Sequence, residues 1–275
     1  MEIWNTLLFQ PLVSLLVVFL KTFGNFGIAI IVLTILLRAV LIPLTIPSMK
    51  AQKKMAELAP VIAKLKKKHA GDKAKLAKAQ MELYKQAGAN PAAGCLPMIV
   101  QFVILIALYQ AFIQILQVDG KDVVAKINEI VYPFLRLPQE AKVDLSFLYL
   151  NLAKPDTVNI PGLPPLPGLF LILAAISQLL SGKMIAPVAK IVEKEAKKTP
   201  EKSDDMMASM QSQMLYLFPV MTIFIGYSFP SGLVLYWFIF SAFQLVQQYF
   251  MFGWGGLAPW LEKIGISATM KANLK

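Results

Sequence analysis

Long apolar stretches alternate with polar segments along this chain. Windows of about 20 mostly apolar residues, the length that crosses a hydrocarbon core of about 30 Å, lie at 25–47, 95–117, 165–183, 211–229 and 230–251. The pattern predicts five transmembrane helices. The expected fold class is therefore an all-α polytopic membrane protein.

Residues 1–24 contain a shorter apolar run, from 7 to 20. Because Gln10, Ser14 and Lys21 share one helical face, this run predicts an interfacial helix on the outer face of the membrane. A short sixth span and an uncleaved signal-anchor are the alternatives. The chain begins without a basic stretch, so a cleaved secretory signal is not expected.

Charge in the polar segments predicts the orientation. Residues 50–88 hold 11 Lys against three acidic residues, whereas residues 118–162 hold 5 Lys or Arg against 6 Asp or Glu. Since basic loops stay inside, the N-terminus is expected outside and the C-terminus in the cytoplasm. The cytoplasmic segments are then 48–94, 184–210 and 252–275, and the external loop is 118–164.

The cytoplasmic segment 48–94 has its own periodicity. Apolar residues recur at helical spacing before and after Gly71, which predicts a helical hairpin turning at that glycine. The lysines at 64 and 66–68 form either a solvated face or a surface for anionic lipid or ribosomal RNA. In the external loop, the proline-rich stretch from Pro155 to Pro167 cannot form regular helix.

Composition agrees with a membrane protein. The chain is 57% hydrophobic and 16% charged, with a mean hydropathy of +0.60, whereas soluble domains carry about 25% charged residues. The single cysteine, Cys95, rules out an internal disulfide framework.

The spans lack the residues of common catalytic sites. No acidic residue lies within any predicted span, and the one histidine, His69, lies in the hairpin. Intramembrane hydrolysis needs a carboxylate pair, a serine with a base, or a metal site. We therefore expect no enzyme activity, catalytic residue, metal or cofactor. Proton-coupled transport is disfavoured for the same reason.

One arginine, Arg38, lies in the middle of the first predicted span. A charge at that depth costs at least about 2.5 kcal/mol, and such residues face a bundle interior or a wet cavity. Uncharged polar residues in the spans are candidates to line a groove open to the cytoplasm: Thr34, Gln101, Gln178, Tyr236, Ser241 and Gln244. The alternative is an arginine held by backbone carbonyls or glutamines to fix helix packing, with the glutamines joining helices.

Several motifs occur in order along nearly the whole chain. They are Leu33-Thr34 with Arg38 to Thr45, Lys54-Met55, Leu83-Tyr84, Asn90 to Pro97 with Gln101, Pro219, Phe229 to Trp237, and Gln247-Gln248. Together they resemble the YidC-type membrane protein insertases of bacteria and organelles. The resemblance indicates a minimal bacterial form without a large periplasmic domain.

The resemblance implies a five-helix core with a cytoplasmic hairpin and a hydrophilic groove closed to the outside. It places Arg38 on the family's groove arginine, and Thr34, Gln178, Tyr236 and Trp237 along the groove or the slide beside it. Ile225 and Phe229 fall on the outer, apolar slide. Ser241 stands where the family often has asparagine.

The implied function is that of an insertase and chaperone in the bacterial plasma (inner) membrane. The groove would admit polar tails of nascent membrane proteins, and apolar segments would leave into lipid. Expected partners are nascent membrane proteins and the bilayer, with the ribosome and the Sec translocon as further candidates and no small-molecule substrate. A small channel or lipid scramblase using the same groove is the alternative, and a structural assembly factor is a third.

Overall fold

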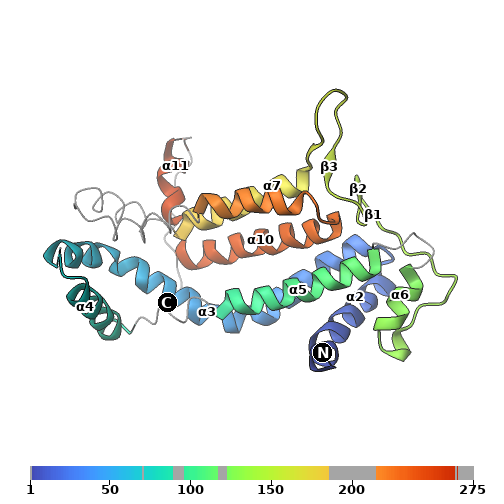
Figure 1. Ribbon diagram of the computed structural model, residues 1–275, viewed down its shortest axis with the longest axis horizontal. Coiled ribbons are helices and arrows are strands. Elements are labelled where there is room, and N and C mark those ends of the chain that lie inside the picture. The colour runs from blue at the N-terminus through green and yellow to red at the C-terminus, as the bar shows by residue number, and fades with distance from the viewer. Residues whose placement is uncertain are drawn as a thin grey trace. The chain divides into compact units, whose positions relative to one another are not determined.

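The computed structural model describes residues 2–69, 71–88, 96–116, 123–185, 215–263 and 265. Its contacts divide the chain into two units, to which the same long helices contribute. Most of the helices and strands are labelled in Figure 1. Unit 1 comprises Met1–Leu41, Ile99–Ala175 and Met221–Phe243. Unit 2 comprises Ile42–Met98, Ile176–Val220 and Gln244–Lys275.

Unit 1 begins with a helical segment that ends at a glycine. Its elements are α1 (Glu2–Trp4), the π-helical η1 (Asn5–Phe9) and α2 (Gln10–Phe23). Gly24 caps α2 at φ +70°, a left-handed conformation that costs glycine little, and its N–H bonds the Leu20 carbonyl at 2.8 Å. Asn25 then starts the next helix, because its side-chain oxygen accepts the Ile28 N–H at 3.1 Å.

The N-terminal helix packs on the external loop through residues that the sequence predicts as its polar face. The buried hydroxyl of Ser14 accepts the Tyr132 N–H at 3.3 Å. The Lys21 ammonium donates to the Arg136 carbonyl at 3.1 Å. The stretch Asn5–Phe23 is long and apolar enough to cross a membrane. Its interfacial position therefore stays a prediction beside the spanning alternative.

The other long helices coincide with predicted spans. They are α3 (Phe26–Lys68), α5 (Leu96–Leu116), α7 (Leu169–Ile185), the unlabelled helix Leu215–Gly226, and α10 (Ser231–Phe252). Within α3, α5 and α10, the stretches Phe26–Met55, Ile99–Leu116 and Ser231–Phe252 are long and apolar enough to cross a membrane, whereas α7 and Leu215–Gly226 are shorter. The all-α polytopic fold class is confirmed, and the exact number of crossings stays a prediction.

Helix α3 is longer than the predicted span. Its 43 residues carry both the first apolar window and the first arm of the hairpin, so the boundary predicted at residue 47 does not interrupt the helix. Pro43 and Pro47 lie within it. The membrane segment and the hairpin arm are therefore one continuous element.

Unit 1 contains a hydrophobic core built by α2, α3, α5, α10 and the external loop. Its fully buried side chains include Phe26, Ile30, Leu33, Leu108, Phe112, Leu152 and Leu233. The rings of Phe26 and Phe112 meet edge to face, with centroids 6.2 Å apart. Gly232 permits a close approach of α10, since a Cβ there would lie 3.3 Å from the Leu152 carbonyl oxygen. This approach joins the start of α10 to the external loop, and the Gly232 N–H donates to the same Leu152 carbonyl at 3.1 Å.

The described part of the external loop, with the few residues that follow its predicted end at 164, forms short helices and strands. It contains α6 (Val123–Ile130), the 3-10 turn η3 (Pro133–Leu135), and two antiparallel strand pairs, β1 (Ser146–Phe147) with β2 (Leu150–Asn151) and β3 (Thr157–Val158) with β4 (Leu166–Pro167). The proline-rich stretch forms the β3–β4 hairpin, as expected of a segment that cannot be helical.

Unit 2 contains the helical hairpin made by the end of α3 and by α4 (Lys73–Gln86). The turn lies where the sequence predicts it, with Gly71 at φ +96°. Asp72 caps α4, because its carboxylate accepts the Lys75 N–H at 3.0 Å. The chain continues after α10 through η4 (Gly255–Leu257) and α11 (Ala258–Lys263).

Some predicted segments lie outside the described residues. They are residues 89–94 of the cytoplasmic segment 48–94, most of the cytoplasmic loop 184–210, the first residues of the predicted span 211–229, residues 118–122 of the external loop, and residues 264 and 266–275 of the tail.

Candidate functional site

The side chain of Arg38 lies within unit 1 against aromatic rings of α10. It is only 9% exposed. The guanidinium carbon stands 4.0 Å from the ring centroid of Phe240 and 5.4 Å from that of Phe243. Rings at this distance attract a cation through their quadrupole, by about 2 kcal/mol or more when the pair is desolvated. The aromatic faces thus offset part of the cost of burying the charge.

The hydrogen-bonding capacity of Arg38 is largely unused. Its Nη2 donates to the Phe240 carbonyl at 3.4 Å, and its buried Nε has no hydrogen-bond partner among the described residues. A guanidinium has five N–H donors. No ion pair joins Arg38 to a carboxylate in the part of the chain that the structure describes. The backbone carbonyl contact is of the kind that the packing alternative expects, but it leaves the buried Nε without an acceptor among the described residues.

Three predicted groove residues, Gln101, Tyr236 and Thr34, lie in unit 1 on α5, α10 and α3. The Gln101 side chain donates to the Tyr236 hydroxyl at 2.9 Å, which joins α5 to α10. The rings of Tyr236 and Phe240 are 6.1 Å apart, so this pair lies beside the aromatic contact of Arg38. Thr34 is buried and bonds within its own helix, to the Ile30 carbonyl at 2.6 Å.

The remaining unit 1 candidates lie along α10 and at the end of the preceding helix. Ser241 is buried and Trp237 is half-buried. Ile225, 40% exposed, lies on the apolar helix Leu215–Gly226. Phe229 is half-buried in the turn between that helix and α10, where its ring centroid lies 5.2 Å from that of Tyr109. Exposed apolar side chains on a membrane helix are suited to lipid contact. This is the property that an apolar slide requires.

Gln178 and Gln244 belong to unit 2, on the parts of α7 and α10 that follow Ala175 and Phe243. Both are half-buried. Whether they share one groove with Arg38 stays a prediction.

Unit 2 holds its helices through polar side chains. The Gln247 amide donates to the Thr45 hydroxyl at 2.8 Å, which joins α10 to α3. The Ser181 hydroxyl donates to the Gln248 amide oxygen, which joins α7 to α10. These glutamines act as interhelical contacts, the role that membrane helices often give to such residues.

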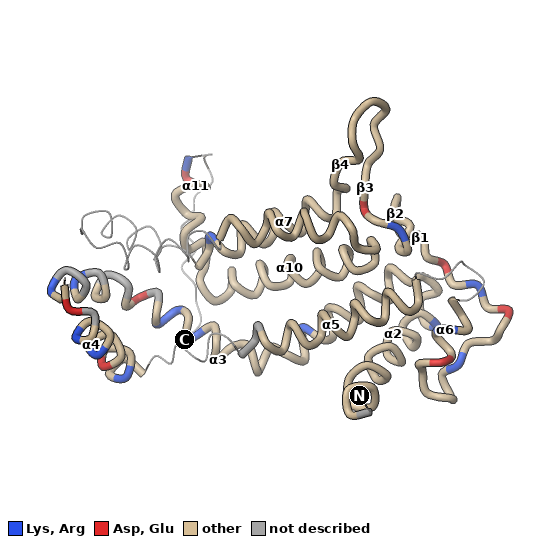
Figure 2. Tube along the Cα trace, in the orientation of Figure 1, with Lys and Arg blue, Asp and Glu red and all other residues tan. Residues whose placement is uncertain are grey.

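Two adjacent lysines of α3 bind the ends of other helices. The Lys53 ammonium donates to the Met251 carbonyl at 3.3 Å, at the end of α10, and the Lys54 ammonium to the Ala87 carbonyl at 3.5 Å, just past α4. A cation is stabilising at a helix C-terminus, where backbone carbonyls lack partners. The hairpin lysines seen in Figure 2 therefore include two with structural contacts.

Sequence reasoning missed the aromatic neighbours of Arg38. Phe240 and Phe243 belong to a helix rich in aromatic residues, and no spacing singles them out. Only the packing of α3 against α10 identifies them. Thr45 and Gln247 entered the sequence argument through the resemblance alone.

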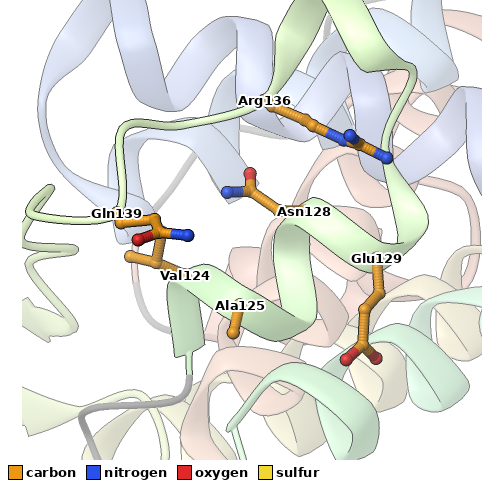
Figure 3. A pocket seen from close by; sticks show the side chains of 6 residues that line it. All are labelled: Val124, Ala125, Asn128, Glu129, Arg136 and Gln139. Atoms are coloured by element: carbon orange, nitrogen blue, oxygen red, sulfur yellow. The ribbon is translucent and has the colours of Figure 1, made fainter.

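A pocket of about 540 Å³ lies elsewhere, in the external loop (Figure 3). It is lined by Val124, Ala125, Asn128, Glu129, Arg136 and Gln139. The Asn128 side chain holds the loop, donating to the Leu137 carbonyl at 2.8 Å and accepting its N–H at 2.7 Å. None of the predicted groove residues lines this pocket.

Comparison with known proteins identifies the family. The model of a family described as 60Kd inner membrane protein matches residues 18–254. A protein of Fusobacterium nucleatum named membrane protein insertase YidC is 35% identical over 84% of this chain and 88% of its own length. Proteins of the same name from Pelobacter propionicus and Nitratidesulfovibrio vulgaris are 32% and 31% identical over 90% of this chain.

The chain spans only 39% and 38% of the length of the latter two relatives. The resemblance seen in the sequence motifs is nevertheless confirmed, because the family model covers most of the chain. The apolar helices and these relatives together indicate a multi-pass protein of the inner membrane. The chain belongs to the 60Kd inner membrane protein family, the family of the YidC-type membrane protein insertases.

Proposed function

We propose that this protein is a membrane protein insertase in which Arg38 attracts the polar, acidic part of a client. The observation that supports this proposal is a buried guanidinium with one hydrogen bond and no carboxylate partner among the described residues. An acidic client residue would supply the missing acceptors. The relatives named as insertases support the insertase part of this proposal.

The mechanism is physical rather than enzymatic. A short polar tail enters a groove lined by Arg38, Thr34, Gln101, Gln178, Tyr236, Trp237, Ser241 and Gln244. Polar side chains and water replace bare hydrocarbon around the tail, so the barrier to crossing falls. The apolar segment of the client then leaves past Ile225 and Phe229 into lipid.

The hairpin would receive the client first, from the cytoplasm. Its lysines favour contact with anionic partners, among them lipid headgroups and ribosomal RNA. The ribosome is a proposed partner on this basis, and the Sec translocon is a further candidate partner that the insertase proposal itself suggests. The N-terminus is proposed to lie outside and the C-terminus inside.

The central test removes the charge. Arg38→Ala is expected to reduce several-fold the insertion of a single-span client whose translocated tail carries acidic residues, measured by protease protection in proteoliposomes. The same client with Asn and Gln in place of those acids should be much less affected. Arg38→Lys should retain most activity if charge matters more than the bidentate fork.

Arg136→Ala provides the matched control, since Arg136 is the chain's other arginine and lies exposed in the external loop. Full insertion of the acidic client by Arg38→Ala would refute the electrostatic role. Lipid-flip and conductance measurements on the same vesicles separate an insertase from a scramblase or channel. Normal insertion with loss of assembled complexes would identify an assembly factor instead.

A further inference from the structure

The β3–β4 hairpin is an apolar projection with no charged residue. No Asp, Glu, Lys or Arg occurs between Asp156 and Lys183. The side chains of the hairpin are nevertheless solvent-accessible: Val158 is 43% exposed, Ile160 42%, Leu163 57% and Leu166 40%. Four exposed aliphatic side chains on one short hairpin form a patch that in water would favour association.

The tip of the hairpin is a defined turn. The Leu163 N–H bonds the Ile160 carbonyl at 3.1 Å across Pro161 and Gly162, and Gly162 has φ +84°. Proline followed by a glycine of positive φ is the signature of a type II turn. The turn fixes the shape of the segment that carries Ile160 and Leu163.

The base of the hairpin is bonded to α7. The Asp156 carboxylate is buried, accepts the Leu171 N–H at 2.9 Å and accepts the Tyr149 hydroxyl at 2.8 Å. Its backbone carbonyl accepts the Gly168 N–H at 2.8 Å. The Tyr227 hydroxyl donates to the Pro165 carbonyl at 2.7 Å, which adds a contact just past the helix Leu215–Gly226. The hairpin therefore has a fixed origin at the start of an apolar helix.

The direction of the hairpin suits a membrane surface. In Figure 1 it turns aside from the axis of α7 instead of extending that axis. Within the same unit, the first turns of α7 also expose apolar side chains, Leu169 and Ile172. If α7 crosses the bilayer, a hairpin that leaves its end sideways runs along the membrane plane.

Charge separates the hairpin from the rest of the external loop (Figure 2). The preceding segment contains six charged residues between 136 and 156, namely Arg136, Glu140, Lys142, Asp144, Lys154 and Asp156. Charged segments stay in water, whereas uncharged aliphatic segments enter the headgroup and acyl boundary. The loop thus has a part suited to water and a part suited to lipid.

We propose that the β3–β4 hairpin inserts its tip into the bilayer leaflet that borders the start of α7, with Ile160, Leu163 and Leu166 among the acyl chains. The hairpin anchors the external loop to lipid. This role depends on the membrane location of α7 and not on Arg38, so it can be tested independently of the insertase proposal.

The test places an environment-sensitive fluorophore at single cysteines in a Cys95→Ser background. One is Leu163→Cys at the tip, and the matched control is Lys142→Cys, exposed in the charged part of the same loop. The purified full chain is reconstituted in phospholipid vesicles with nitroxide lipids that quench at about 5–10 Å below the surface. A blue-shifted emission and strong quenching are expected at position 163 and neither at position 142.

Emission and quenching at position 163 equal to those at position 142 would overturn the proposal. A second experiment labels Val158→Cys and adds Ile160→Asp with Leu163→Asp, which touch only exposed side chains. The two acids should abolish the quenching and leave the thermal unfolding of the protein in detergent unchanged. Persistent quenching, or a hairpin that stays in water in vesicles and crosslinks to a protein in cells, would contradict lipid anchoring.

Discussion

The two units differ in the balance of contacts that join their long helices, because unit 1 adds an extensive apolar core to polar bonds such as that of Gln101 with Tyr236. Unit 1 has a continuous hydrophobic core of buried aromatic and aliphatic side chains. The described helix contacts of unit 2 include hydrogen bonds between side chains, Gln247 to Thr45 and Ser181 to Gln248, and lysines bound to helix ends. A packed core resists any change of volume, whereas a polar bond is exchangeable for one to water or to a headgroup.

The difference in contacts between the two units agrees with the segments that each unit contains. Unit 1 includes the external loop, and unit 2 includes the lysine-rich hairpin and its turn at Gly71. In the orientation proposed above, a client from the cytoplasm would meet the lysine-rich hairpin of unit 2 first. Contacts that exchange with water at small cost allow such a unit to rearrange.

Each unit also buries one cation against aromatic rings. Arg38 stands over Phe240 in unit 1, and the Lys183 ammonium lies 3.2 Å from the ring centroid of Trp260 in unit 2. Lys183 lies near the end of α7 and Arg38 lies within the apolar part of α3. Depth makes Arg38 the more costly of the two and the stronger candidate for function.

The largest expected effect is loss of packing in unit 1. Phe112→Ala should lower the free energy of unfolding by about 3–5 kcal/mol, because Phe112 is fully buried and the cavity cannot refill. Thermal unfolding in detergent measures the change. Phe102→Ala on the same helix is the control, since that side chain is 45% exposed and should cost much less. Equal losses would show that the core of unit 1 is not the main source of stability.

A change of opposite sign is expected at Arg38. Arg38→Met keeps the side chain long and removes the charge, so unfolding should become harder by about 1–4 kcal/mol while insertion of acidic clients falls. The paired measurements are thermal unfolding and protease protection. A less stable Arg38→Met would instead favour the packing role for the arginine.

A smaller effect is expected for the polar contacts of unit 2. Gln247→Leu breaks the bond to Thr45 and should cost about 0.6 kcal/mol, and at most about 1.7 kcal/mol. Gln86→Leu, an exposed glutamine of α4, should change stability less. A loss as large as that of Phe112→Ala would remove the contrast between the two units.

The smallest effect concerns pH and the surface of unit 1. The hydroxyl and N–H of Ser146, with the Asn25 amide, hydrogen-bond the Asp144 carboxylate and hold its pKa below the usual value of about 3.9. A lowered pKa stabilises the fold above that usual value, and the contribution is lost as pH falls through the folded-state pKa. The melting temperatures of wild type and Asp144→Asn should therefore converge below about pH 4.

Glu140→Gln, an exposed carboxylate of the same loop, serves as the control. A difference between wild type and Asp144→Asn that persists unchanged to pH 3 would show that the hydrogen bonds do not depend on the charge.

Much of the fold was predictable because the signals are local. Apolar windows mark the helices, and Gly71 with Asp72 marks the hairpin turn, since a left-handed glycine and a capping carboxylate act within a few residues. The length of α3 was not predictable from the same windows. Its apolar window ends while the helix continues, because Pro43 and Pro47 lie inside it without ending it.

The candidate site was predictable only in part. Arg38 stood out because a charge in an apolar window is rare, and Gln101 and Tyr236, chosen as polar residues within spans, proved to be bonded to each other. Nothing in the sequence indicated that Phe240 and Phe243 cover Arg38, since a phenylalanine in a membrane helix can face lipid as readily as it can face a cation. Gln178 and Gln244 were grouped with Arg38 by polarity and resemblance, and they belong to the other unit.

The sequence by itself determined the class of protein, the order of its helices, its family and the one deep cation. Each follows from residue types and their spacing along the chain, which hydropathy and local backbone chemistry convert directly into structure. Only the tertiary structure decided that Phe240 covers Arg38 and leaves its Nε without a partner among the described residues. It also decided that unit 1 adds an extensive apolar core to its polar bonds, and that Gln247 joins Thr45 in unit 2. Such contacts join residues about 200 positions apart, such as Arg38 with Phe240 and Thr45 with Gln247, so local sequence patterns do not reveal them.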